Sequence, residues 1–102
     1  MSTTAFEMFF ADATLDQYDQ VLEKMGFQDG IGPEHALFHW VAEVDGGIKV
    51  VDLWDSPAAF EQFAATSMGP LTAEVGIGEP LITTYEVHNT LVGQDVLATA
   101  KA

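Results

Sequence analysis

The hydrophobic pattern of the predicted strands constrains this fold more than any other feature of the sequence. Four apolar segments read as strands: Thr4–Ala11, His35–Val44, Ile48–Asp55 and Pro80–His88. A sheet with one face in water should alternate apolar and polar residues along each strand. Here both faces are apolar, as in the first strand, where Phe6, Met8 and Phe10 oppose Phe9. The predicted sheet therefore needs cover on both of its faces.

Two predicted helices lie between the strands. The first begins at Thr14, with Gln17 as its capping-box partner, and ends before Gly26. The second begins at Ser56-Pro57 and is expected to end at Gly69-Pro70, with one irregular turn after it. The order of elements is βαββαβ, which predicts an α+β fold of the ferredoxin-like class with a four-stranded antiparallel sheet.

Two helices can cover only one face of such a sheet. An exposed apolar face of this width would aggregate, so a second copy related by a two-fold axis is the expected cover. A homodimer joined through its sheet faces would bury about 800 Å² per partner. We expect one domain over residues 1–88, and a C-terminal tail or dimer arm over residues 89–102.

Charge and composition exclude several classes of function. The chain has 102 residues, a formal net charge of −13 and no cysteine. Its basic residues are Lys24, Lys49 and Lys101, and arginine is absent. Binding to nucleic acid or to an anionic membrane surface requires many cations, so neither is expected. No apolar segment is long enough to span a membrane, and we expect a cytoplasmic protein.

His39 and Asp52 are the candidate catalytic residues. A two-residue hairpin loop at Asp45-Gly46 would place them opposite each other, and a loop at Gly46-Gly47 would make them diagonal neighbours. A three-residue loop would separate them onto opposite faces. A carboxylate beside an imidazole fixes its tautomer and raises its basicity, which suits proton abstraction. The alternative is a buried polar pair that only sets strand register.

Apolar and aromatic side chains near this pair are candidates for binding a flat hydrophobic ligand. Trp54 ends a strand where a cleft would open, and Tyr85 could donate a hydrogen bond to the ligand. The other candidate substrate-binding residues are His35, Leu37, Val41, Val50 and Phe63. His35 and His39 lack a third ligand at suitable spacing, so no metal site is expected. No phosphate-binding glycine motif is present, and we expect no cofactor.

The segment GGIKVVDLWDSPAAFEQF, followed by MGPL, resembles the antibiotic biosynthesis monooxygenase superfamily of dimeric α/β barrels. The resemblance covers about residues 4–88. It implies one of several activities, among them cofactor-independent oxygenation of aromatic polyketides, haem degradation and isomerisation. The haem-degrading members use an asparagine of the first strand and a helical histidine. This chain has Glu7 in that strand and no histidine in either predicted helix.

The residues and the resemblance together favour a small homodimeric enzyme acting on an apolar aromatic or enolisable metabolite. We expect a cofactor-independent monooxygenase in which His39, oriented by Asp52, abstracts a substrate proton. An isomerase or cyclase would need the same base. A non-catalytic protein that binds a hydrophobic small molecule or haem is the alternative.

Overall fold

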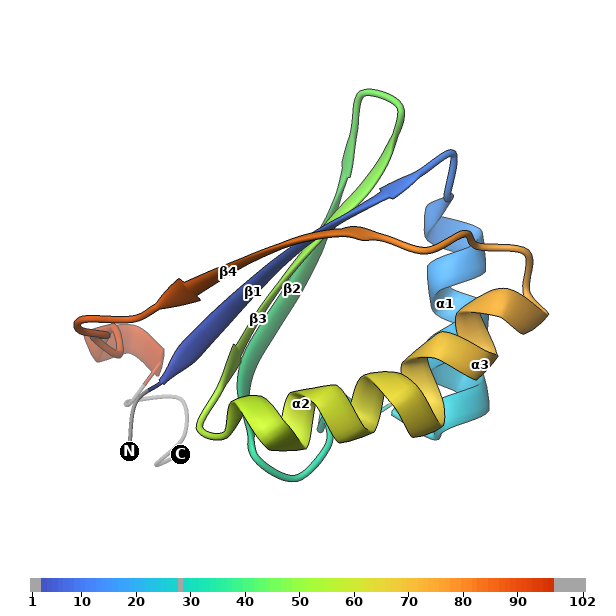
Figure 1. Cartoon of the computed structure of the whole chain (residues 1–102). Helices are drawn as coiled ribbons and strands as arrows, with labels where there is room; N and C mark the ends of the chain where they lie inside the picture. The colour runs from blue at the N-terminus through green and yellow to red at the C-terminus, as the bar shows by residue number, and fades with distance from the viewer. Residues whose placement is uncertain (1–2, 28, 97–102) are drawn as a thin grey trace.

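A four-stranded antiparallel sheet forms one layer of the structure, which is a computed structural model that describes residues 3–27 and 29–96 (Figure 1). The strands are β1 (Thr4–Ala11), β2 (Ala36–Val44), β3 (Gly47–Trp54) and β4 (Leu81–Glu86). Their order across the sheet is β2-β3-β1-β4, with every neighbouring pair antiparallel. This is the ferredoxin-like α+β topology that the element order predicts.

The helices form a second layer on one face of the sheet (Figure 1). Helix α1 (Leu15–Met25) begins with the predicted capping box between Thr14 and Gln17 and ends at Gly26, which has a left-handed backbone. Helix α2 (Pro57–Phe63) is capped by the Ser56 hydroxyl. It continues into a π-helical segment, η1 (Ala64–Met68), and then into α3 (Gly69–Glu74).

The expected helix end at Gly69-Pro70 is wrong. The Gly69 N–H donates to the carbonyl of Ala64, five residues earlier, so the chain passes this point as a π turn. A Cβ atom at Gly69 would lie 2.9 Å from that carbonyl oxygen. Glycine therefore allows the close approach, and the wider turn brings the chain past Pro70 without ending the helix.

The main core lies between the helices and the sheet. The helix-facing side chains of β1 and β3 are buried as the alternation predicts: Phe6, Met8, Phe10, Ile48, Val50 and Trp54. From α2, Phe60 stacks on Phe6 with ring centroids 3.8 Å apart and meets Trp54 edge-on. Burying these aromatic rings supplies much of the apolar area that holds the two layers together.

Strict alternation along β2 predicts that Leu37 shares a face with Val41 and that Ala36 shares a face with Phe38, and this is wrong at the start of the strand. Ala36 pairs with Trp54 and Phe38 pairs with Leu53, so Leu37 is the extra residue of a β-bulge. The bulge reverses the alternation before it, which puts Ala36 against the core instead of on the outer face. Leu37 is correspondingly 54% exposed.

The outer face of the sheet has no helix over it (Figure 1). Exposed apolar side chains on this face include Phe38, Trp40, Leu81 and Tyr85, and an ion pair between Lys49 and Glu7 crosses it. Of the predicted tail, residues 89–96 are described, and residues 97–102 lie outside the described part of the chain. None of the helices within residues 3–27 and 29–96 combines the length and hydropathy needed to cross a membrane.

Candidate active site

The hairpin between β2 and β3 places His39 directly opposite Asp52. Val44 pairs with Gly47, so the loop is the two-residue turn at Asp45-Gly46. His39 Nδ1 lies 2.5 Å from Asp52 Oδ1. The Asp52 side chain is 9% exposed, whereas the His39 side chain is 40% exposed. The pair thus joins a buried carboxylate to an imidazole that other groups can reach.

The surroundings of Asp52 set the tautomer of His39. The indole N–H of Trp54 donates to Asp52 Oδ2 at 3.2 Å. A carboxylate has only acceptor oxygens, so its other oxygen accepts from His39 Nδ1–H. The proton of the neutral imidazole therefore sits on Nδ1, and Nε2 carries the lone pair. This is the tautomer that a general base requires on its Nε2 side.

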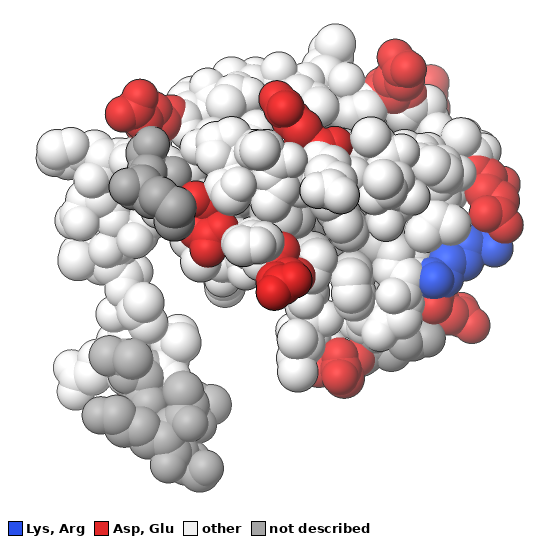
Figure 2. Space-filling view, turned by 60° about the horizontal axis from the view of Figure 1, so that its bottom comes forward, with Lys and Arg blue, Asp and Glu red and all other residues white. Residues whose placement is uncertain are grey.

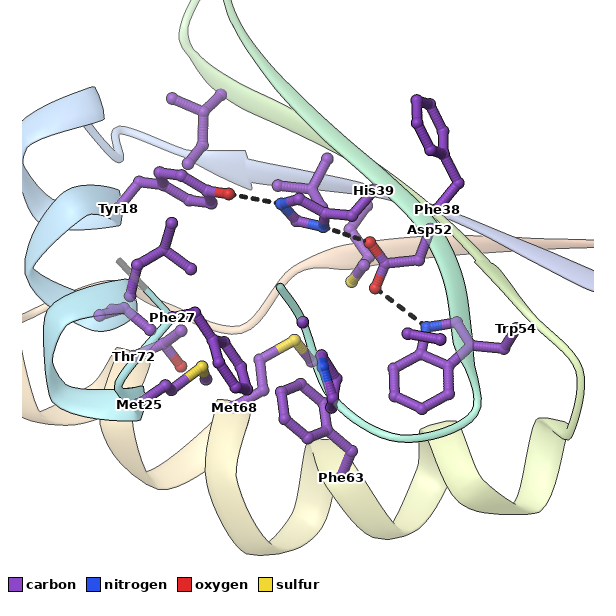
Figure 3. A pocket seen from close by; sticks show the side chains of 18 of the residues that line it. Tyr18, Met25, Phe27, Phe38, His39, Asp52, Trp54, Phe63, Met68 and Thr72 are labelled. Atoms are coloured by element: carbon purple, nitrogen blue, oxygen red, sulfur yellow. Dashed lines mark hydrogen bonds and ion pairs between the residues drawn. The ribbon is translucent and has the colours of Figure 1, made fainter. Parts of the chain in front are cut away.

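Tyr18 of α1 completes a chain of four side chains that the sequence reasoning missed. Its hydroxyl is hydrogen-bonded to His39 Nε2, so the chain runs from Tyr18 through His39 and Asp52 to Trp54 (Figure 3). The helical spacing of Leu15, Tyr18 and Val21 predicts only that Tyr18 lies on the apolar stripe of the first helix. The available signal was chemical, because a tyrosine in such a stripe needs a hydrogen-bond partner for its hydroxyl.

The pKa of Tyr18 is raised from its ordinary value of 10.0 to about 12. Burial is the main cause, and the negative charges of Asp52 and Asp19 add to it. The tyrosine is therefore a neutral phenol at physiological pH. It serves His39 as a hydrogen-bond donor and remains available to accept a hydrogen bond on its oxygen.

These polar groups lie along the wall of a cavity of about 440 Å³ between the sheet and the helices (Figure 3). Its volume is within the range of small-molecule sites. The apolar side chains around it come from the strands, α1, the loop after α1, α2, η1 and the loop after α3: Met8, Phe10, Val21, Leu22, Met25, Phe27, Ile31, Leu37, Ile48, Val50, Trp54, Phe63, Met68 and Ile77. The cavity is an apolar space with one polar end.

The cavity brings together six of the predicted site residues. Besides His39 and Asp52, they are Trp54, Leu37, Val50 and Phe63. Phe63 and Met68 stand at the two ends of the π-helical segment, so this irregularity lies at the cavity wall. Such segments are frequent at functional sites.

Three predicted substrate-binding residues lie elsewhere. Tyr85 pairs with Ala5 on the outer face of the sheet, because the alternation of β4 turns it away from the helices. His35 has a positive φ of 72°, and its Nδ1 lies 3.1 Å from Asp55 Oδ1 outside the cavity. Val41 pairs with Val50 and packs against the core without lining the cavity.

No cationic side chain of the described residues lines the cavity. Lys24 pairs with Glu74, and Lys49 pairs with Glu7 on the outer face. Figure 2 shows acidic groups spread over one face of the molecule, with positive charge at one place only. Within residues 3–27 and 29–96, no group of three His, Asp or Glu side chains could hold a metal ion. An uncharged ligand suits this cavity better than a carboxylate or a phosphate.

Comparison with known proteins gives a result only at the level of three-dimensional structure. No family model matches the sequence, and no curated protein matches it. Among solved structures, SnoaB, a cofactor-independent oxygenase from Streptomyces nogalater, aligns with a TM-score of 0.58 and 14% identity, over 88% of this chain and 96% of SnoaB. The chain has the fold of the antibiotic biosynthesis monooxygenases.

Two further structures with this fold agree. The monooxygenase ActVA-Orf6 of Streptomyces coelicolor, solved with the ligand nanaomycin D, aligns with a TM-score of 0.55 and 16% identity, over 91% of this chain and 93% of that one. A Deinococcus radiodurans protein assigned to the antibiotic biosynthesis monooxygenases has a TM-score of 0.56 and 16% identity, over 92% of this chain and 99% of its own. At this identity the likeness concerns the fold, and the chemistry must be argued from the side chains.

Proposed function

We propose that the protein is a cofactor-independent monooxygenase that acts on a neutral, flat, hydrophobic molecule with an acidic hydroxyl or an enolisable carbonyl. The observation that carries this proposal is the 2.5 Å contact of His39 with Asp52 at the polar end of an apolar cavity. The cofactor-independent oxygenase SnoaB, which shares the fold, supports the assignment of reaction type.

The chain's own residues provide the base and its surroundings. Removing a proton from the substrate leaves an electron-rich anion and an imidazolium paired with the Asp52 carboxylate. The apolar walls exclude water, and they hold the ring system in place while the anion reacts with O₂. The substrate supplies all the electrons: one oxygen atom enters it as a new carbonyl, and the other leaves as water with two substrate hydrogens.

The probe 1-naphthol tests this reaction, because its oxidation by one O₂ to 1,4-naphthoquinone and one water is balanced without a reductant. We expect chelator-treated protein to form the quinone above the rate without protein, with one labelled oxygen from ¹⁸O₂. His39→Gln should lower this rate by about 10²–10⁴-fold. His35→Gln is the matched control and should not change it, since His35 lies outside the cavity.

Three results would contradict the proposal. They are the absence of protein-dependent quinone from 1-naphthol and from larger hydroxylated ring systems, a His39→Gln variant as active as the wild type, and a product without ¹⁸O. Saturable binding of the probe without turnover would support a non-catalytic binding protein instead.

We also propose that a second copy covers the outer face of the sheet. Phe38 is 63% exposed and Leu81 is 74% exposed on this face, which no helix of the described chain covers. The same patch on two copies is self-complementary about a two-fold axis, and about 800 Å² per partner is the area of a stable interface. Exposed Leu91 and Val92 of the C-terminal segment suit an arm on the partner.

A further inference from the structure

The two ring nitrogens of His39 are both engaged in the structure. Nδ1 faces Asp52 Oδ1, and in the neutral Nδ1-protonated ring Nε2 accepts a hydrogen bond from the Tyr18 hydroxyl. The lone pair that would take a substrate proton is therefore already occupied by a phenol from the protein itself. A substrate must either displace Tyr18 or reach His39 through it.

The geometry of the Tyr18–His39 contact is that of a proton-transfer pair. The two rings are nearly parallel, with an interplanar angle of 8° and centroids 5.8 Å apart. The Tyr18 hydroxyl lies within hydrogen-bond distance of His39 Nε2, so a proton can pass directly between the two groups. The contact joins α1 to β2, and packed elements on both sides hold it in place.

The phenolic oxygen of Tyr18 has acceptor capacity to spare. A tyrosine hydroxyl donates one hydrogen bond and can still accept another. The indole N–H of Trp54 can only donate, and the Thr72 hydroxyl, which donates to the Gly69 carbonyl at 3.0 Å, makes no hydrogen bond to His39. Figure 3 shows Tyr18 and Thr72 reaching the cavity from different helices. Tyr18 is thus the group beside the base that can receive a substrate O–H.

We propose that Tyr18 is a catalytic residue that relays the substrate proton to His39. The substrate O–H bond breaks as its proton binds the Tyr18 oxygen, and the Tyr18 O–H bond breaks as its proton binds His39 Nε2. The products are a substrate anion, a neutral tyrosine and an imidazolium whose charge is balanced by Asp52. No electrons are transferred in this step. This inference rests on the proposed function, because it uses the same base.

The relay requires a hydroxylic substrate and differs in this from direct abstraction by His39. A hydroxyl can donate to the Tyr18 oxygen with the usual hydrogen-bond geometry, whereas a C–H acid cannot. If Tyr18 only blocked the lone pair of His39 Nε2, removing its hydroxyl would expose Nε2 and improve proton transfer from the substrate to His39. The two roles therefore predict opposite effects of Tyr18→Phe.

The first experiment measures how much bound 1-naphthol is ionised as a function of pH, from the separate absorbance band of the naphtholate. We expect wild type to stabilise the naphtholate. Tyr18→Phe should still bind the probe with its Kd within about threefold, while the naphtholate fraction falls by about tenfold or more. Tyr85→Phe is the matched control, since Tyr85 lies on the outer face of the sheet.

The outcomes separate failure of the relay from failure of the base. If Tyr18→Phe keeps or increases the naphtholate while His39→Gln abolishes it, His39 meets the substrate directly and the relay is wrong. If His39→Gln keeps the naphtholate, or if wild type never forms it, the proposed base is wrong and the relay fails with it.

A second experiment keeps the tyrosine in place and therefore does not depend on how Tyr18→Phe folds. The chain has two tyrosines, so 3-fluorotyrosine in a Tyr85→Phe background labels position 18 alone. The relay predicts a larger ¹⁹F shift on binding 1-naphthol than on binding naphthalene, which has the same rings without the hydroxyl. Fluorination lowers the pKa of the Tyr18 phenol. The relay therefore also predicts that fluorination of Tyr18 shifts the pH at which the bound 1-naphthol ionises. Equal ¹⁹F shifts with both ligands, together with an unmoved pH, would overturn the relay.

Discussion

Replacing Asp52 with asparagine should reverse the tautomer of His39. The buried Trp54 N–H can only donate, so the single carbonyl oxygen of the new amide must face it. The amide NH₂ then faces His39 Nδ1, which becomes an acceptor, and the ring proton moves to Nε2. The base loses its lone pair on the side of Tyr18, although the shape of the site is almost unchanged.

The structure sets the size of both effects. Asp52 accepts two hydrogen bonds, and replacing each charged acceptor with a neutral one costs about 1 kcal/mol. The loss of stability is then at most about 2 kcal/mol, and a lower cost of burying an amide offsets part of it. Proton abstraction should fall by about 10³–10⁴-fold, the effect known when an amide replaces the carboxylate that orients the catalytic histidine of a serine protease.

Long-range ¹H–¹⁵N spectra of the histidine side chains report the tautomer directly. We expect His39 to be protonated on Nδ1 in wild type and on Nε2 in Asp52→Asn. Asp55→Asn is the matched control, because Asp55 contacts His35 and should leave His39 unchanged. An Nδ1-protonated His39 in folded Asp52→Asn, or full activity of that variant, would refute the reasoning.

Three further predictions concern ionisation, packing and assembly. The pKa of Tyr18 is about 12 in the folded protein and about 10 in the unfolded chain, so the free energy of unfolding should fall as the pH rises between these values. Urea denaturation at several pH values should show this loss in wild type and not in Tyr18→Phe. Phe60→Ala removes a ring that is 3% exposed and stacked on Phe6, so it should lower the free energy of unfolding by about 3–5 kcal/mol in the same assay. A decrease under about 1 kcal/mol would contradict the packing. Native mass spectrometry should show a dimer for wild type and a monomer for Trp40→Glu, and a monomeric wild type would refute the proposed assembly.

Much of the fold could be predicted from local patterns. The two-residue period predicted the buried faces of β1 and β3. The hairpin register was left open between turns at Asp45-Gly46 and Gly46-Gly47, and the structure has the first. Either of these two registers predicted that His39 and Asp52 are neighbours, because directly opposed and diagonal residues on two strands lie within reach of each other.

The features that could not be predicted depend on contacts between distant segments or on local irregularities. A helical stripe shows that Tyr18 faces inward, but the partner of its hydroxyl is 21 residues away on another element. The bulge at Leu37 and the positive φ at His35 each interrupt the alternation without a sequence mark. The dipeptide Gly69-Pro70 is typical of a helix end. Here a π turn passes through the same two residues, and the helical chain continues.

The protonation state of His39 with a ligand in the cavity tests the central claim most directly. The chain has three histidines, and His39→Gln identifies the resonances of His39 in the ¹⁵N spectrum. With 1-naphthol bound at neutral pH, we predict a His39 imidazolium with protons on both ring nitrogens, and with naphthalene bound a neutral ring protonated on Nδ1. A neutral His39 in both complexes would contradict the account.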